Sequence, residues 1–184
     1  MKSTNALSGE RVSLQNRPKK ESDILAHCQN VQDFFVKNKI KLGIAESCTG
    51  GLLSSFITAL PGSSKYFEGA IVSYSGAIKE ALLSVPKHTM QSLGQVSEPV
   101  ALAMARGAKE QLMTQWAVSI TGIAGPTGGS VDKPVGTVCF AVVGPGFARS
   151  VTKGFESRER TQIQWEAANF ALEILIGATQ GKIN

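Results

Sequence analysis

The sequence lacks the residue patterns on which several large protein classes depend. Its three cysteines, Cys28, Cys48 and Cys139, are widely spaced and form no C-x-x-C pair, which argues against a disulfide framework and a zinc knuckle. No run of 18 apolar residues is present, and no apolar segment follows Lys2, so neither a membrane span nor a secretory signal is predicted. These absences predict a cytoplasmic protein with no membrane partner.

The basic excess is confined to one end of the chain. The 184 residues carry a net charge of +5, but residues 1–20 hold five basic residues and one acidic residue, whereas the other 164 hold 14 basic and 13 acidic ones. The first segment also has few large apolar side chains, so it cannot bury enough surface to offset the entropy of ordering. We therefore expect a solvated, disordered tail over residues 1–21, in preference to a nucleic-acid-binding arm, and a single domain over residues 22–184.

Within the domain, short apolar segments alternate with helical patterns. The predicted helices cover residues 22–38, 49–60, 75–85, a segment from 97 onward, and 159–176, and the predicted strands cover residues 41–45, 70–74, 116–120, 136–143 and 148–154. Strands separated by helices pair in parallel, and the closing hairpin adds an antiparallel edge. The predicted fold class is α/β, a three-layer α/β/α sandwich around a mixed, mostly parallel sheet with an antiparallel edge strand.

Three polar or glycine-rich segments follow predicted strands, over residues 46–51, 74–79 and 121–129. Ligands of such sheets bind outside the carboxyl ends of the strands. Ser47, at a strand-to-helix junction ahead of Gly50 and Gly51, fits a helix cap or phosphate ligand, and it also fits a nucleophile beside backbone N–H groups. The residues alone leave these alternatives open.

A serine nucleophile needs a base. His27 falls within the first helix and His88 in a connecting segment, and Ala45 stands where the nucleophile elbow G-x-S-x-G has glycine. Lys79 is the remaining candidate, because it lies in the first turn of the helix after the second strand. It would need a pKa lowered by about 3 units, roughly 4 kcal/mol, which burial and a helix N-terminus both favour.

Two neighbours of Ser47 have open roles. Cys48 could be a thiolate nucleophile, but a small buried thiol is the favoured interpretation. Glu46 could polarise Lys79 or Ser47, and it could equally cap a helix or pair with a lysine.

Four segments, taken together and in order, resemble the signature segments of the CinA carboxy-terminal domain family. They are A-E-S-C-T-G-G (45–51), Y-S-x-x-x-K (74–79), G-Q-V-S-E-P (94–99) and S-I-T-G-I-A-G-P-T-G-G-S-V-D-K-P-V-G-T-V (119–138). The similarity extends from about residue 24 to 176. The family's stand-alone members are amidohydrolases that convert nicotinamide mononucleotide and water to nicotinate mononucleotide and ammonia in pyridine nucleotide salvage. The resemblance implies this activity for a small-molecule nucleotide substrate, with no metal and no cofactor, in a homo-oligomer.

By the same resemblance, Ser47 matches the nucleophile and Lys79 its general base. Tyr74 matches a tyrosine that orients the amine or relays a proton, and Thr121 matches a hydroxyl of the active site. For the anionic groups we predict backbone donors at two glycine-rich segments, one for the oxyanion and one for the ribose phosphate, in either order. The predicted substrate-binding residues are Thr49, Gly50 and Gly51, then Gly122 and Gly125 of the loop 122–129, and Arg160.

The sequence departs from the family pattern at a few positions. Many members have Asn-Glu where this chain has Gly76-Ala77, the spacing ahead of Arg160 is one residue longer, and Gln164 replaces a frequent arginine. These departures put substrate affinity in doubt more than chemistry. They also leave a second hypothesis, a non-catalytic nucleotide-binding or regulatory module.

Overall fold

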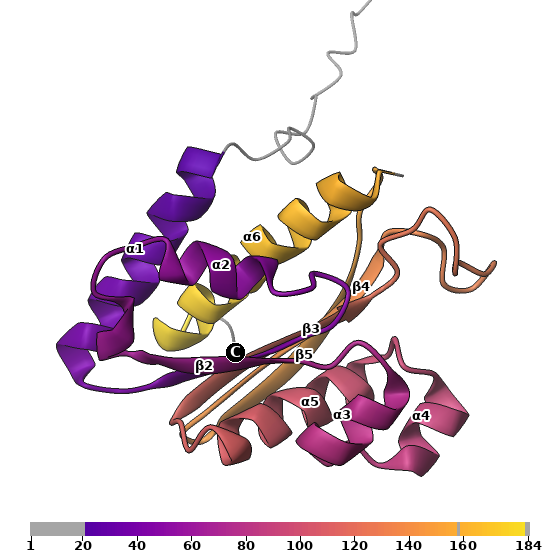
Figure 1. Cartoon of the computed structure of the whole chain (residues 1–184), viewed down its shortest axis with the longest axis horizontal. Coiled ribbons are helices and arrows are strands. Elements are labelled where there is room, and N and C mark those ends of the chain that lie inside the picture. The colour runs from indigo at the N-terminus through magenta and orange to yellow at the C-terminus, as the bar shows by residue number, and fades with distance from the viewer. Residues whose placement is uncertain (1–20, 158, 183–184) are drawn as a thin grey trace, which may run out of the picture.

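A computed structural model describes residues 21–157 and 159–182 (Figure 1). Of the predicted tail over residues 1–21, residues 1–20 lie outside these ranges, and the placement of residue 21 in the tail is wrong, because Glu21 begins the first helix. The elements are α1 (Glu21–Asn38), β1 (Leu42–Glu46), α2 (Leu52–Thr58), η2 (Ser63–Lys65), β2 (Phe67–Val72), α3 (Gly76–Leu83), α4 (Lys87–Leu93), α5 (Glu98–Gln111), β3 (Trp116–Gly122), β4 (Thr137–Gly144), β5 (Phe147–Gly154) and α6 (Arg160–Thr179).

The five strands form one sheet in the order β2-β1-β3-β4-β5. β1 pairs in parallel with β2 and β3, whereas β4 pairs antiparallel with β3 and with β5. The mixed sheet and its antiparallel edge hairpin are therefore confirmed. The strand that runs against the other four is β4, which lies one position inside the edge.

Helices cover both faces of the sheet, as the three-layer prediction requires. Figure 1 shows α1, α2 and α6 on one face and α3, α4 and α5 on the other. Each face has its own cluster of buried apolar side chains. The second face is packed closely enough that a Cβ on Gly107 of α5 would lie 2.1 Å from the carbonyl oxygen of Leu83, at the end of α3. Glycine at position 107 therefore lets α5 support α3.

The largest differences from the sequence prediction concern one strand and one helix. The second strand runs from Phe67 to Val72 and not from 70 to 74, because Ser75 caps α3 by accepting a hydrogen bond from the N–H of Ile78, so the chain has left the sheet by Tyr74. The helix α4 was not predicted. It has no buried residue, so its sequence carries no apolar periodicity.

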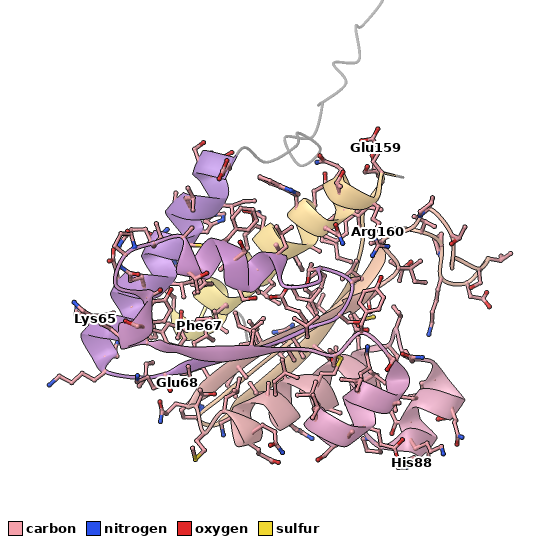
Figure 2. The ribbon with its side chains drawn as sticks, viewed as in Figure 1. Lys65, Phe67, Glu68, His88, Glu159 and Arg160 are labelled. Atoms are coloured by element: carbon pink, nitrogen blue, oxygen red, sulfur yellow. The ribbon has the colours of Figure 1, made fainter. Side chains whose placement is uncertain are left out.

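The register of the strands brings the polar and glycine-rich segments that follow β1, β2 and β3 to one edge of the sheet. Ala45 of β1 is aligned with Ile71 of β2 and with Ser119 of β3, so the residues two positions further on emerge together at the carboxyl ends. Figure 2 shows Phe67 and Glu68 at the start of β2, and Lys65 just before them in η2, on the opposite side of the molecule from Arg160. Among the described helices, none is long and apolar enough to cross a membrane.

Candidate active site

Lys79 and Ser47 form a buried pair at the carboxyl edge of the sheet. The Nζ of Lys79 lies 2.8 Å from Ser47 Oγ and donates a second hydrogen bond, of 2.7 Å, to the carbonyl oxygen of Ser73. Lys79 is 1% exposed and Ser47 is 7% exposed. The first turn of α3 thus places Lys79 against Ser47, the residue that follows β1.

The environment of this amine disfavours its charged form. Burial lowers the pKa of Lys79 from 10.5 to about 8, because water that would solvate an ammonium is excluded. Both of its hydrogen-bond partners are neutral oxygens. At pH 7 about one amine in ten is then neutral, compared with fewer than one in a thousand at the ordinary pKa of a lysine.

Glu46 holds the first turn of α2. Its carboxylate is fully buried and accepts hydrogen bonds from the N–H groups of Gly51, Leu53 and Ser54 and from the hydroxyl of Ser54, at 2.6–3.2 Å. Of the roles considered for Glu46, the structure thus assigns helix capping. This capping fixes the position of the junction that carries Ser47.

The capping corrects the prediction that Gly50 and Gly51 supply oxyanion donors. The N–H of Gly51 donates to Glu46, and the N–H of Gly50 donates to the carbonyl oxygen of Ser47 at 3.1 Å. Both amides are therefore engaged within the chain. Of the three predicted donors in this segment, only the N–H of Thr49 makes no hydrogen bond to another described residue.

Cys48 is a buried thiol, as favoured. It is 5% exposed, and burial raises its pKa to about 12, so it is not a thiolate near neutral pH. Its carbonyl oxygen accepts a hydrogen bond of 2.8 Å from Gln164. Gln164, which replaces a frequent arginine of the family, thereby joins α6 to the segment that carries Ser47.

A cavity of about 270 Å³ opens above the Ser47–Lys79 pair. This volume is near the lower end of the range for small-molecule sites. Six predicted residues line it, namely Ser47, Tyr74, Lys79, Thr121, Gly122 and Arg160, together with Cys48, Gln95, Val96 and Ala124. The predicted residues Thr49, Gly50, Gly51 and Gly125 do not line it. Gln95 and Val96 were missed as site residues, although the segment 94–99 that contains them was singled out.

Arg160 bridges two segments at the mouth of the cavity. Its guanidinium donates to the hydroxyl of Tyr74 at 2.7 Å and to the carbonyl oxygen of Gly125 at 2.9 Å. Figure 2 shows Arg160 at the start of α6. The hydroxyl of Tyr74 binds Arg160, and the carbonyl of Ser73 holds the amine of Lys79. The role expected for Tyr74, orienting the amine or relaying a proton, stays a prediction.

Two other predicted residues have structural partners. The hydroxyl of Thr121 donates to the carbonyl oxygen of Gln95 at 3.0 Å. A Cβ on Gly122 would lie 2.7 Å from the side chain of Val138. Glycine at position 122 thus allows β3 to pack against Val138 of β4. The same residue also lines the cavity.

Neither histidine is near Ser47. His27 is hydrogen-bonded through Nδ1 to Asn169 at 2.9 Å, between α1 and α6, and Figure 2 shows His88 on the outer side of α4. Within the described ranges, no three His, Cys, Asp or Glu side chains gather as potential metal ligands. Lys79 is therefore the base that the structure places against the serine hydroxyl.

Comparison with known proteins identifies relatives of the whole described domain. The family model of the CinA C-terminal domain matches residues 25–179. A CinA-like protein of Prochlorococcus marinus subsp. pastoris is 50% identical over 140 residues, which is 75% of this chain and 32% of that protein. One from Gloeobacter violaceus is 44% identical over 142 residues, 77% of this chain and 33% of that protein. The chain spans about a third of the length of these curated relatives.

Solved structures share the fold over most of their length. The competence/damage inducible protein CihA from Agrobacterium tumefaciens is 35% identical, with a TM-score of 0.83 over 86% of this chain and 96% of that one. A CinA superfamily protein from Escherichia coli is 30% identical, with a TM-score of 0.82 over 90% of this chain and 97% of that one. The resemblance found in four sequence segments thus extends to the entire domain.

Proposed function

The chain belongs to the CinA C-terminal domain family, and on that premise we propose that it hydrolyses the carboxamide of nicotinamide mononucleotide to nicotinate mononucleotide and ammonia. The observation that carries the proposal is the 2.8 Å contact between Lys79 Nζ and Ser47 Oγ in a buried setting. The substrate itself comes from the family resemblance.

Lys79 acts as the base for Ser47. In its neutral form the amine still donates to the carbonyl of Ser73, and its lone pair accepts the proton of the Ser47 hydroxyl. The serine oxygen attacks the carboxamide carbon as that proton moves to Nζ. The resulting ammonium then gives the proton to the leaving nitrogen, so that ammonia departs and an ester remains on Ser47.

The second half of the reaction reuses the same groups. Neutral Lys79 takes a proton from water, the hydroxide formed attacks the ester carbon, and the ammonium returns a proton to Ser47 Oγ as the acid leaves. Backbone N–H donors aimed at the developing oxyanion contribute a large part of the rate in acyl transfer. Cys48 lines the cavity, and its N–H makes no hydrogen bond to another described residue, so it is the candidate donor in the segment after Ser47.

Arg160 is the candidate ligand of the substrate phosphate. A guanidinium has five N–H donors, and the hydrogen bonds to Tyr74 and Gly125 use two of them. Remaining donors and a full positive charge suit a phosphate oxygen. The carboxamide would then lie at the inner end of the cavity and the phosphate at its mouth.

A non-catalytic nucleotide-binding module would need the cavity but not a neutral amine. Burying Lys79 without a carboxylate costs free energy, and a merely structural role gives no benefit in return. This cost favours catalysis. The structure also gives Gly76, one of the departures behind the module hypothesis, a local role, because the side chain of Gln95 lies beside it.

The test is the release of ammonia from nicotinamide mononucleotide by the purified chain. We expect turnover by the wild type and a loss of at least a thousandfold in Ser47→Ala and in Lys79→Met. Ser64→Ala and Lys87→Met are matched controls, because both residues are exposed and neither lines the cavity. Micromolar nucleotide binding without ammonia release by the wild type would favour the module instead.

A further inference from the structure

The side chain of Gln95 lies over Gly76, the first residue of α3. A Cβ on Gly76 would be 3.2 Å from Nε2 and 3.3 Å from Cδ of Gln95, which is tighter than most Cβ contacts, so the exposed Gln95 side chain would have to shift by a few tenths of an ångström to admit it. Gly76 is not among the glycines with a positive φ, so no turn requires a glycine there. The missing side chain at position 76 therefore makes room for the carboxamide of Gln95.

The backbone around Gln95 is fixed from two sides. Thr121 Oγ1 donates to the carbonyl oxygen of Gln95 at 3.0 Å. Lys133 Nζ donates to the carbonyl oxygens of Leu93 at 2.7 Å and Val96 at 2.8 Å. The side chain of Gln95 thus extends from an anchored segment toward the cavity that it lines.

Burial orders the cavity from an inner end to a mouth. Ser47, Lys79 and Thr121 are buried, whereas Gln95 is exposed and Tyr74 is 61% exposed. The carboxamide of Gln95 makes no hydrogen bond to any other described side chain or backbone group. A primary amide with both donors and its acceptor uncommitted therefore stands at the mouth, beside the first turn of α3 that carries Lys79.

We infer that Gln95 is a specificity-determining residue that hydrogen-bonds the ribose hydroxyls of a nucleotide substrate. The inference rests on the proposed function, which puts the scissile carboxamide at Ser47 and the phosphate at Arg160. The ribose joins these two groups, so it passes the mouth where Gln95 lies. A neutral amide both donates and accepts, which matches a pair of hydroxyls and does not compete with Arg160 for the phosphate.

Variants at three positions test the inference in the ammonia assay with nicotinamide mononucleotide. Gln95→Ala removes the amide, and Gly76→Asn puts a side chain where the amide lies. Both are expected to raise KM about tenfold and to change kcat less than twofold, as loss of a ground-state contact requires. Ala77→Asn is the matched control, since it adds the same side chain at the next, exposed position, and its KM should stay within twofold of the wild type.

Coupling between the two positions separates this role from a general disturbance of α3. If Gly76→Asn acts by displacing Gln95, the double variant has the same KM as Gln95→Ala alone. If the double variant raises KM by the product of the two single effects, the inference is contradicted. An unchanged KM in Gln95→Ala would contradict it too.

Calorimetry on the Ser47→Ala chain makes the inference independent of turnover. Adding Gln95→Ala should weaken binding of nicotinamide mononucleotide about tenfold and leave binding of nicotinamide, which has no ribose, unchanged. This result would support the inference even if the wild type released no ammonia. If Gln95→Ala weakens binding of both ligands equally, or weakens binding of neither, the inference about Gln95 is overturned. The proposed function would still be supported by ammonia release from the wild type.

Discussion

The amine of Lys79 and the hydroxyl of Ser47 lie 2.8 Å apart, although 32 residues separate them along the chain. Ser47 follows β1 at the point where Glu46 caps α2, and Lys79 occupies the first turn of α3 after the neighbouring strand β2. Two crossovers of a parallel sheet therefore meet in one acid–base pair. The proposed reaction depends on the amine being neutral.

The activity of the chain should rise with pH through the pKa of Lys79. The neutral amine is the active base, so kcat/KM is expected to increase as the pH rises through about 8 and to level off above it. The measurement is kcat/KM for ammonia release between pH 6 and 10. A profile that is flat over this range, or one still rising steeply at pH 10, would argue against a buried lysine base.

The stability of the fold should depend on pH through the same group. The pKa of Lys79 is about 8 when folded and 10.5 ordinarily, so between these values the unfolded chain binds more protons and stability rises with pH. Relative to Lys79→Met, the wild type should gain up to about 3 kcal/mol between pH 7 and 11. Urea denaturation of both proteins at several pH values measures the difference, and a constant difference would exclude the lowered pKa.

Loss of the carboxylate at position 46 should weaken the start of α2. Glu46→Gln keeps the side chain's shape but replaces one acceptor oxygen by a donor facing N–H groups, which should cost about 2 kcal/mol of unfolding free energy. Activity should fall too, because Ser47 adjoins the cap. Glu110→Gln, at an exposed position of α5, is the control and should change neither. Equal stability of the two variants in urea would contradict the assigned role of Glu46.

Substitution of Arg160 should affect binding more than chemistry. Arg160→Met removes the cation at the mouth and the hydrogen bonds to Tyr74 and Gly125, and KM for nicotinamide mononucleotide should rise at least tenfold with kcat changed much less. The dephosphorylated nucleoside is the control substrate. If KM for the nucleoside rises by the same factor, Arg160 does not bind the phosphate.

The sequence pattern allowed the prediction of the layers of the fold, and the family resemblance added Ser47 and Lys79 as the candidate catalytic pair. Apolar periodicity indicated most of the helices and strands, and Ser47 and Lys79 stood at the ends of neighbouring strands, where a parallel sheet brings them together. The helix α4 has no fully buried residue, and Met90 alone among its side chains packs against the core of the described domain, so its apolar pattern was too short to reveal a helix. The second strand ends at Val72 because of a side-chain cap at Ser75, which a propensity pattern does not resolve.

The partners of the polar groups could not be predicted from spacing. Gly50 and Gly51 suit a backbone anion site in sequence, but their amides bind Ser47 and Glu46 in the folded chain. Tyr74 binds Arg160, a residue 86 positions away. Gln95 lies beside Gly76 and lines the cavity. The positions of Tyr74 and Gln95 depend on tertiary packing, and the partners of Gly50 and Gly51 depend on the local path of the turn. The sequence pattern carries no direct signal of either.

The most direct test of the Ser47–Lys79 mechanism is trapping of the acyl-enzyme with hydroxylamine. When the wild type acts on nicotinamide mononucleotide in the presence of hydroxylamine, the ester on Ser47 should partition between water and the amine. The hydroxamate of nicotinate mononucleotide should then appear beside the acid, and Ser47→Ala should form neither product. Ammonia release that yields only the acid at every hydroxylamine concentration, and that persists in Ser47→Ala, would contradict the mechanism.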